Sequence, residues 1–257
     1  MPPEPKLGPT ILERIDLTLA DRLVGAAADA DILASADGLR ERLYSPSGGD
    51  ARWIGSLLRL RGLLVLDEDV ADVLTGNTAR FPSGTQESCM IRGLHELLCA
   101  MRERGRSGRT PDGAFLREAF EIMTAGIARF RNNTLRRDQP WDSILYVSYP
   151  GPWEVEERLS TFDEAHRYHD APSLFDGLHP ARQAWRVLYR FARLSPFPDM
   201  NLPMAWVAMC SYLLARGYPI LAAAPQDQGL LHRLIGGSPP ARLRQFEGRL
   251  LEAVESL

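Results

Sequence analysis

The chain has 257 residues, of which 45% are hydrophobic and 25% charged, and its formal net charge is -3. This length is sufficient for one large domain, and the composition is that of an ordinary globular protein, which excludes a disordered chain. The weak negative charge gives no support for non-specific nucleic-acid binding, so we expect no nucleic-acid partner. Three cysteines without metal-ligand spacing, and an N-terminus without a basic segment followed by an apolar one, predict a cytoplasmic protein with no signal peptide.

The first fifty residues predict a helical extension. Apolar residues recur at helical spacing between Ile11 and Ala26, and a second helix is expected after them. The serine- and glycine-rich segment 45–50 is the clearest loop of the chain. We therefore expect an N-terminal helical extension over residues 1–50 and a second domain over residues 51–257.

Helices also dominate the prediction for the following part of the chain. Helical patterns cover Arg52–Leu60, a segment that begins with the acids of Asp67–Asp69, and the amphipathic stretches Ile91–Met101 and Phe115–Phe130. Ile144–Val147 is the only convincing strand pattern, because it combines β-branched, aromatic and aliphatic residues.

His166 and His169 are a candidate metal or acid–base pair. They are three residues apart and flanked by acidic side chains, so a helix would place both imidazoles on one face. The spacing fixes no third ligand, and a solvated helix end is the alternative interpretation. The sequence does not decide whether these two histidines form a site.

A helix, a tight loop and a second helix form the centre of the pattern. Trp185 and Leu188 belong to the apolar face of the first helix, which Pro196 and Pro198 end. The second helix contains no charged residue over 202–215, so we expect it to be buried; it is too short for a membrane span, which needs about 20 residues. The intervening loop, residues 195–203, lies at the mouth of this helix, where helix N-termini bind anions. Near the end of the chain, residues 241–254 predict a terminal amphipathic helix.

These central residues resemble the Fic (Fido) family, whose motif reads His-x-Phe-x-Asp/Glu-Gly-Asn-Gly-Arg-x-x-Arg. Pro196, Phe197, Asp199 and Asn201 keep family-like identities, and the flanking residues 214–220 are also similar. The resemblance implies an all-α, mainly helical Fic/Fido fold with a small β-hairpin flap over about residues 131–150. In the family this flap positions a target protein segment by strand pairing.

The motif of this chain departs from the family at the positions that carry its chemistry. Ser195 stands for the histidine that acts as general base, and a hydroxyl cannot replace imidazole near neutral pH. Met200 and Leu202 stand for the two phosphate-loop glycines, and Pro203 and Trp206 for the two arginines. We therefore do not expect AMP transfer by the usual route.

Residues 52–62 resemble the inhibitory helix of the family, in which a glutamate pairs with the second motif arginine. Here Arg61 stands for the glutamate and Trp206 for the arginine, so both halves of that ion pair are absent. Arg61 is then expected to face an anionic ligand or to pack on Trp206. The alternative is a solvated surface charge.

Three functions follow from these residues. In the first, a repurposed pocket acts on or binds a small molecule or nucleotide-like ligand. Ser195 and Asp199 are its candidate catalytic residues, with Asp199 also the candidate ligand for Mg²⁺, and the candidate ligand-binding residues are Asn201, Arg61, Trp206, Phe197, Tyr149 and Arg136. In the second, a non-catalytic protein holds a protein segment at the flap, and in the third the chain is a divergent AMP transferase. We expect no membrane partner, and the sequence fixes neither the substrate, nor the oligomeric state, nor a protein partner.

Overall fold

The computed structural model describes residues 49–77, 79–132, 134–145, 147–165, 180–223 and 227–236. The predicted helices of residues 1–48, the His166–His169 pair and the predicted terminal helix over 241–254 lie outside these ranges. Within the described residues, no helix combines the length and the apolar character that a bilayer crossing needs.

Every regular element of the described residues is helical. The α-helices are α3 (Gly49–Leu60), α4 (Asp67–Thr75), α5 (Gln86–Arg106), α6 (Gly113–Met123), α7 (Val155–Ser160), α8 (Phe162–Ala165), α10 (Pro180–Leu194), α11 (Asn201–Ala215) and α12 (Asp227–Ile235). Two short 3₁₀ helices, η1 (Ala128–Phe130) and η2 (Pro152–Glu154), precede α7. The mainly helical fold class expected from the sequence is therefore confirmed.

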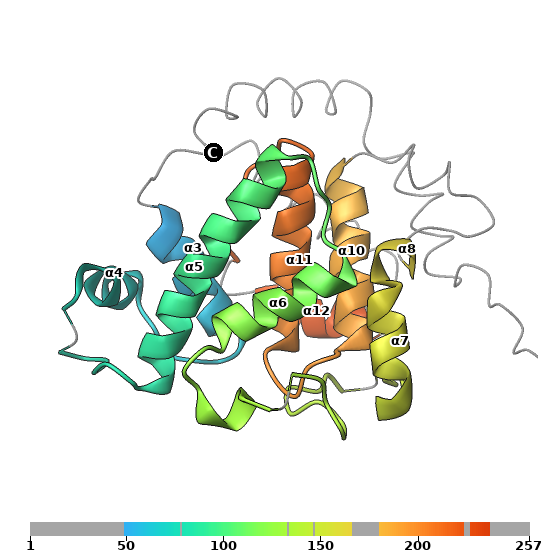
Figure 1. Ribbon diagram of the computed structural model, residues 1–257, viewed down its shortest axis with the longest axis horizontal. Helices are drawn as coiled ribbons and strands as arrows, with labels where there is room; N and C mark the ends of the chain where they lie inside the picture. Colours follow the sequence, from blue (N-terminus) through green and yellow to red (C-terminus); the bar gives the residue numbers. More distant parts are fainter. Residues whose placement is uncertain are drawn as a thin grey trace, which may run out of the picture.

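Helix α11 is the centre of this fold, as its lack of charge predicted. All of its residues from Asn201 to Leu214 are buried. It packs against α10, α5, α3 and α6, and Figure 1 shows it between α5 and α10. Gly105 allows the close approach of α5, because a Cβ atom there would lie 2.8 Å from the Cβ of Leu214.

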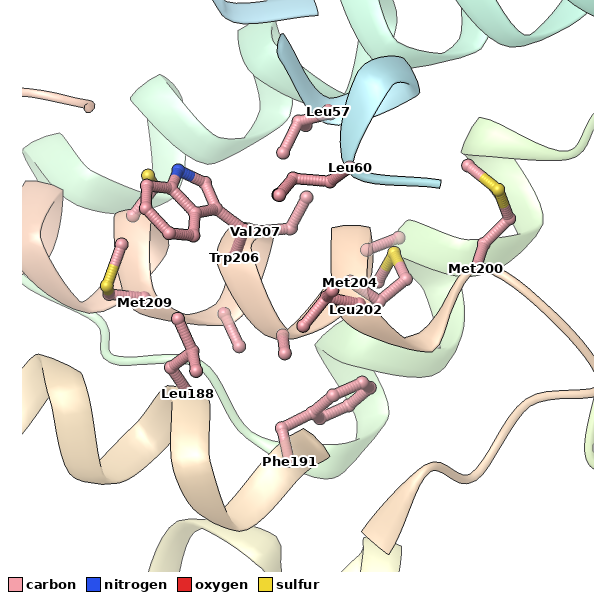
Figure 2. Close-up of a cluster of buried hydrophobic side chains, with 14 of the residues drawn as sticks. Leu57, Leu60, Leu188, Phe191, Met200, Leu202, Met204, Trp206, Val207 and Met209 are labelled. Carbon is pink, nitrogen blue, oxygen red and sulfur yellow. The ribbon is translucent and has the colours of Figure 1, made fainter. Parts of the chain in front are cut away.

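The neighbouring helices bury their apolar faces on α11. Figure 2 shows one cluster in which Leu57 and Leu60 of α3 and Leu188 and Phe191 of α10 surround side chains of α11. Trp206 belongs to this cluster, and its indole Nε1 donates to the carbonyl of Leu221 at 2.7 Å. Trp206, which was predicted from the sequence to line a ligand pocket, is thus a core side chain with an internal hydrogen bond.

The β-hairpin flap is not present among the described residues of segment 131–150. Its backbone donors bind elsewhere: the N–H of Arg136 donates to the carbonyl of Pro196 at 3.0 Å, and that of Trp141 to the carbonyl of Pro198 at 2.8 Å. The N–H of Val147 closes a turn onto Ile144. The described residues of this segment therefore form an irregular loop that lies against the loop between α10 and α11. The strand predicted from Ile144–Val147 was wrong for its described residues, because the N–H of Val147 closes a local turn and that of Ile144 donates to the nearby Tyr149 phenol oxygen.

Candidate functional site

The candidate site is the loop from Ser195 to Pro203, called here the motif loop, together with the segment that covers it. The motif loop joins α10 to α11 at the lower end of the bundle in Figure 1. The covering segment, residues 134–150, is called here the strap. We describe the site from the motif loop outward.

Ser195 directly follows α10 and is not placed as a nucleophile. Its N–H donates to the carbonyl of Phe191 at 2.8 Å and its hydroxyl to the carbonyl of Ala192 at 2.7 Å. The residue is buried, with a φ of 40°. No histidine or carboxylate among the described residues accepts a hydrogen bond from this hydroxyl. A serine needs such a base for nucleophilic catalysis, so the geometry favours a structural role.

Asp199 is buried and paired with two arginines. Its Oδ1 accepts hydrogen bonds from the N–H of Met200 at 2.7 Å and from Nε of Arg61. Its Oδ2 accepts from Nη2 of Arg61 at 3.2 Å and from Nη2 of Arg129 at 3.2 Å. The hydrogen bond to Asp199 raises the pKa of Arg61, although burial opposes that change. Arg61 therefore binds Asp199 of its own chain.

The surroundings of Asp199 do not fit a magnesium ion. Mg²⁺ requires several oxygen ligands in octahedral geometry, and both oxygens of this carboxylate are already bound by guanidinium groups. The positive charges of Arg61 and Arg129 would also repel a divalent cation. Within the described part of the chain, no group of three or more histidine, cysteine, aspartate or glutamate residues could hold a metal ion.

Asn201 is bound to an acid of the strap that the sequence did not single out. Oδ2 of Asp142 accepts hydrogen bonds from the backbone N–H groups of Asn201 at 2.6 Å and Leu202 at 3.4 Å, and Oδ1 accepts from Nδ2 of Asn201 at 2.8 Å. The side chain of Asn201 also bonds the backbone of Phe197 in both directions. The carboxylate of Asp142 thus occupies the N-terminus of α11, where a helix favours negative charge.

The surroundings of Asp142 raise the pKa of its carboxyl and so disfavour its charged form. Burial raises the pKa of this carboxyl, the negative charge of Asp199 raises it further, and the hydrogen bonds from Asn201 and Leu202 oppose both effects. His232 of α12 also interacts with Asp142: burial lowers the pKa of this imidazole, and the charge of Asp142 acts in the opposite direction. The centre of the site therefore contains two carboxylates, Asp142 and Asp199, balanced by the two guanidinium groups of Arg61 and Arg129.

Arg136 fastens the strap to the motif loop. Its guanidinium is buried and donates to three carbonyl groups, those of Ser195 at 2.7 Å, Asp138 at 2.9 Å and Pro150 at 2.6 Å. Burial lowers the pKa of this guanidinium. The phenol oxygen of Tyr149 accepts a hydrogen bond from the N–H of Ile144 at 2.8 Å. Both residues were predicted to bind a ligand, and the structure places them in contacts that hold the strap.

Met200 and Phe197 anchor the motif loop in the core. Met200 has a φ of 64° and a ψ of 20°, the left-handed conformation that glycine adopts without cost, and its side chain is fully buried. Phe197 stacks on Phe120 with a centroid distance of 4.1 Å. The loop therefore keeps a backbone conformation suited to glycine, while its side chains point into the protein.

The predicted site residues thus divide into two groups. The motif loop and strap bring together Ser195, Asp199, Asn201, Arg61, Tyr149 and Arg136, whereas Phe197 and Trp206 belong to the hydrophobic core. Sequence reasoning missed Asp142 and Arg129. No local pattern identifies Asp142, because it caps a helix whose first residue lies 59 positions away.

Comparison with known proteins identifies the fold. No family model and no curated protein matches the chain. Among solved structures, it is similar to a Fic domain containing signaling protein from Bacteroides thetaiotaomicron, with a TM-score of 0.69 and 14% identity over 89% of this chain and 94% of that one. The chain has the Fic fold.

Two further structures agree with this assignment. A Fic family protein from Desulfovibrio desulfuricans G20 has a TM-score of 0.67 and 18% identity, over 97% of this chain and 76% of that one. Fic-1 from C. elegans has a TM-score of 0.64 and 16% identity, over 93% of this chain and 73% of that one. The family resemblance inferred from the motif loop and the flanking residues 214–220 is thereby confirmed at the level of the Fic fold.

Proposed function

We propose that this chain is a Fic-fold protein that does not transfer AMP and that works as a protein-binding module. In this proposal the former catalytic positions hold the strap in place, and the outer surface of the strap contacts the partner. One observation carries the proposal: the carboxylate of Asp142 occupies the N-terminus of α11, while Asp199 is bound by Arg61 and Arg129.

This arrangement opposes nucleotide chemistry in three ways. A phosphate group at the α11 N-terminus would have to displace Asp142 and separate it from three donors. A metal ion at Asp199 would have to displace two guanidinium groups. A target hydroxyl would find no base at Ser195, whose own proton is donated to a main-chain carbonyl.

The test is an AMP-transfer and ligand-binding assay on the full chain. ATP labelled at its α-phosphate, with Mg²⁺, should label neither the chain nor lysate proteins, and ATP with Mg²⁺ should not raise its melting temperature. Two variants are assayed beside the wild type. Asp142→Ser removes the carboxylate from the α11 N-terminus, and its control, Asp138→Ser, removes an exposed carboxylate of the same strap. Label transferred by the wild-type chain and lost in Asp199→Ala would overturn the proposal.

A second candidate function is the binding of a small, nucleotide-like anion at the same site. Its support is that the side chains of Arg61 and Arg129 remain 33% and 40% exposed although both bind Asp199. An anion would then compete with Asp142 for the α11 N-terminus. This function requires a metabolite that raises the melting temperature more in Asp142→Ser than in the wild type, and not in Arg129→Gln.

A further inference from the structure

The tryptophan of η2 is exposed to solvent and held in one position. Trp153 is 84% exposed, the largest exposed fraction of any tryptophan among the described residues. Its indole ring covers the backbone of Gly151, because a Cβ atom there would lie 2.5 Å from the Cζ2 atom of the ring. The N–H of Gly151 in turn donates to Oε2 of Glu154 at 2.7 Å. A large side chain that is ordered before binding loses little conformational freedom in a complex, which favours affinity.

Helix α7 continues directly from η2 and has one buried and one exposed face. Val155 and Leu159 are buried and four residues apart, so they form the inner face. This face packs on α6 and α10, and Figure 1 shows α7 at the edge of the bundle. Glu156 and Glu157 are exposed and follow Trp153 by three and four positions, the spacing of neighbours on one side of a helix. These three side chains therefore share an outer face, called here the Trp153 face.

The backbone of α6 fixes α7 and so fixes the Trp153 face. A Cβ atom at Gly113 of α6 would lie 1.7 Å from the carbonyl oxygen of Leu159, so only glycine permits this close approach. The helix that carries the face is thus mounted directly on the core of the protein.

The Trp153 face has a net negative charge. Glu156 pairs with Arg117 of α6 at an N–O distance of 3.2 Å, and Glu154 with Arg158 at 2.8 Å. Among the described residues, none forms an ion pair with Glu157, whose side chain is exposed. Because the charges of the two ion pairs cancel, the carboxylate of Glu157 is available to a cation that approaches the tryptophan ring.

We propose that the Trp153 face binds a basic protein segment, in which an arginine stacks on the Trp153 ring and pairs with Glu157. A guanidinium group suits both contacts, because it is planar, stacks on aromatic rings and binds carboxylates at two points. Glu157 would instead repel an acidic segment or an anionic lipid surface. The face lies outside the strap and the motif loop, so this proposal goes beyond the proposed function and does not depend on it.

The test is a fluorescence-polarisation titration of the full chain with a labelled peptide that alternates arginine with glycine. The control peptide has glutamine for every arginine. We expect the arginine peptide to bind, added salt to weaken it, and the glutamine peptide to bind about tenfold more weakly or worse. Trp153→Gln should weaken binding about fivefold or more, and Glu157→Gln about threefold. Glu157→Arg should weaken it more than Glu157→Gln does, because it adds repulsion.

Two control variants match these changes in exposure. Leu64→Gln replaces an exposed apolar residue of the loop after α3, and Glu96→Gln an exposed glutamate of α5. Both should bind as the wild type does, and circular dichroism should show that every variant keeps its helices.

Equal binding of the glutamine peptide, equal binding by Trp153→Gln, or no binding of the arginine peptide would overturn the proposal. Binding of anionic vesicles in place of the peptide would also overturn it. So would a wild-type dimer that Trp153→Gln dissociates, because the face would then bind a second copy of the chain. A failed peptide assay leaves the absence of AMP transfer intact, whereas transferred label overturns the proposed function regardless of the peptide result.

Discussion

Arg61, directly after α3, and Asp199, in the motif loop, form a two-point ion pair although they are 138 positions apart in the chain. Arg129 adds a second guanidinium to the same carboxylate from η1. Three segments distant in sequence therefore meet at one buried carboxylate. Because Asp199 also accepts a hydrogen bond from Met200, its charge fixes the backbone at the point where α11 begins.

A double-mutant cycle on Arg61 and Asp199 should measure a favourable coupling free energy between the two side chains. Asp199→Asn places an amide N–H₂ group against two guanidinium groups and should lower the free energy of unfolding by about 2–3 kcal/mol. Arg61→Gln should cost less, because Arg129 still pairs with Asp199. Urea unfolding of both single variants and the double variant should give a coupling of about 1 kcal/mol that falls with added salt, since Arg61 is partly exposed.

The exposed pair of Arg117 and Glu156, with an N–O distance of 3.2 Å, is the control for that cycle. Its coupling should lie close to zero, because water screens both charges. If the Arg61–Asp199 coupling were no larger than this, the ion pair could not be what holds the motif loop.

Removal of the Asp142 cap should destabilise the protein in a pH-dependent way. Asp142→Ala removes the acceptor for two backbone N–H groups and for Asn201, so we expect a loss of about 1–2 kcal/mol in urea unfolding. The pKa of Asp142 is raised in the folded protein, so the folded chain holds this proton at a pH where the unfolded chain has released it. The stability that Asp142 contributes therefore falls as pH rises from about 4 through the folded pKa.

The cost of Asp142→Ala should accordingly be larger at acidic pH and smaller near neutrality. Asp142→Ala also removes the charge that raises the pKa of His232 and of Arg61, and the loss of its attraction to a protonated His232 adds to the cost at acidic pH. Asp138→Ala, which removes an exposed carboxylate of the same strap, should change the stability by no more than about 0.5 kcal/mol. A cost of Asp142→Ala that grows with pH would contradict the burial of this carboxyl and its placement beside Asp199.

Arg136 should tolerate no replacement, even by lysine. A lysine ammonium cannot reach the three carbonyl groups that the planar guanidinium binds, so at least one buried acceptor loses its partner. Arg136→Lys should lower the free energy of unfolding by about 2–3 kcal/mol and make the strap more sensitive to limited proteolysis. Its exposed neighbour gives the control: Arg137→Lys should leave both measurements unchanged within about 0.5 kcal/mol.

The sequence predicted the central helices and the motif loop better than the contacts of the candidate site, because the first depend on local patterns and the second join distant segments. The charge-free run over 202–215 and the proline pair after α10 are local signals, and they located the buried helix and the motif loop. The contacts of Asp142 and Arg136 join the strap to the motif loop across about sixty positions, and no spacing rule encodes them. Arg61 was singled out, but the sequence did not identify Asp199 as its partner. The strand was predicted because residues 144–147 have β-propensity, but the N–H of Val147 closes a local turn onto Ile144 and that of Ile144 donates to the Tyr149 phenol oxygen.

The left-handed backbone at Met200 predicts that glycine is a more stable replacement than alanine there, the reverse of the order expected at Met209 inside α11. Met200 and Met209 are both fully buried, so truncation of either should cost about 2–5 kcal/mol. At Met200, whose φ is 64°, glycine relieves a backbone strain that alanine retains, so Met200→Gly should be more stable than Met200→Ala by about 0.5–1 kcal/mol. At Met209, inside α11, alanine should be the more stable by about 1 kcal/mol, because glycine is a poor helix former. Thermal and urea unfolding of the four variants measure both differences, and alanine proving the better residue at both positions would show that the motif loop does not hold Met200 in the left-handed conformation.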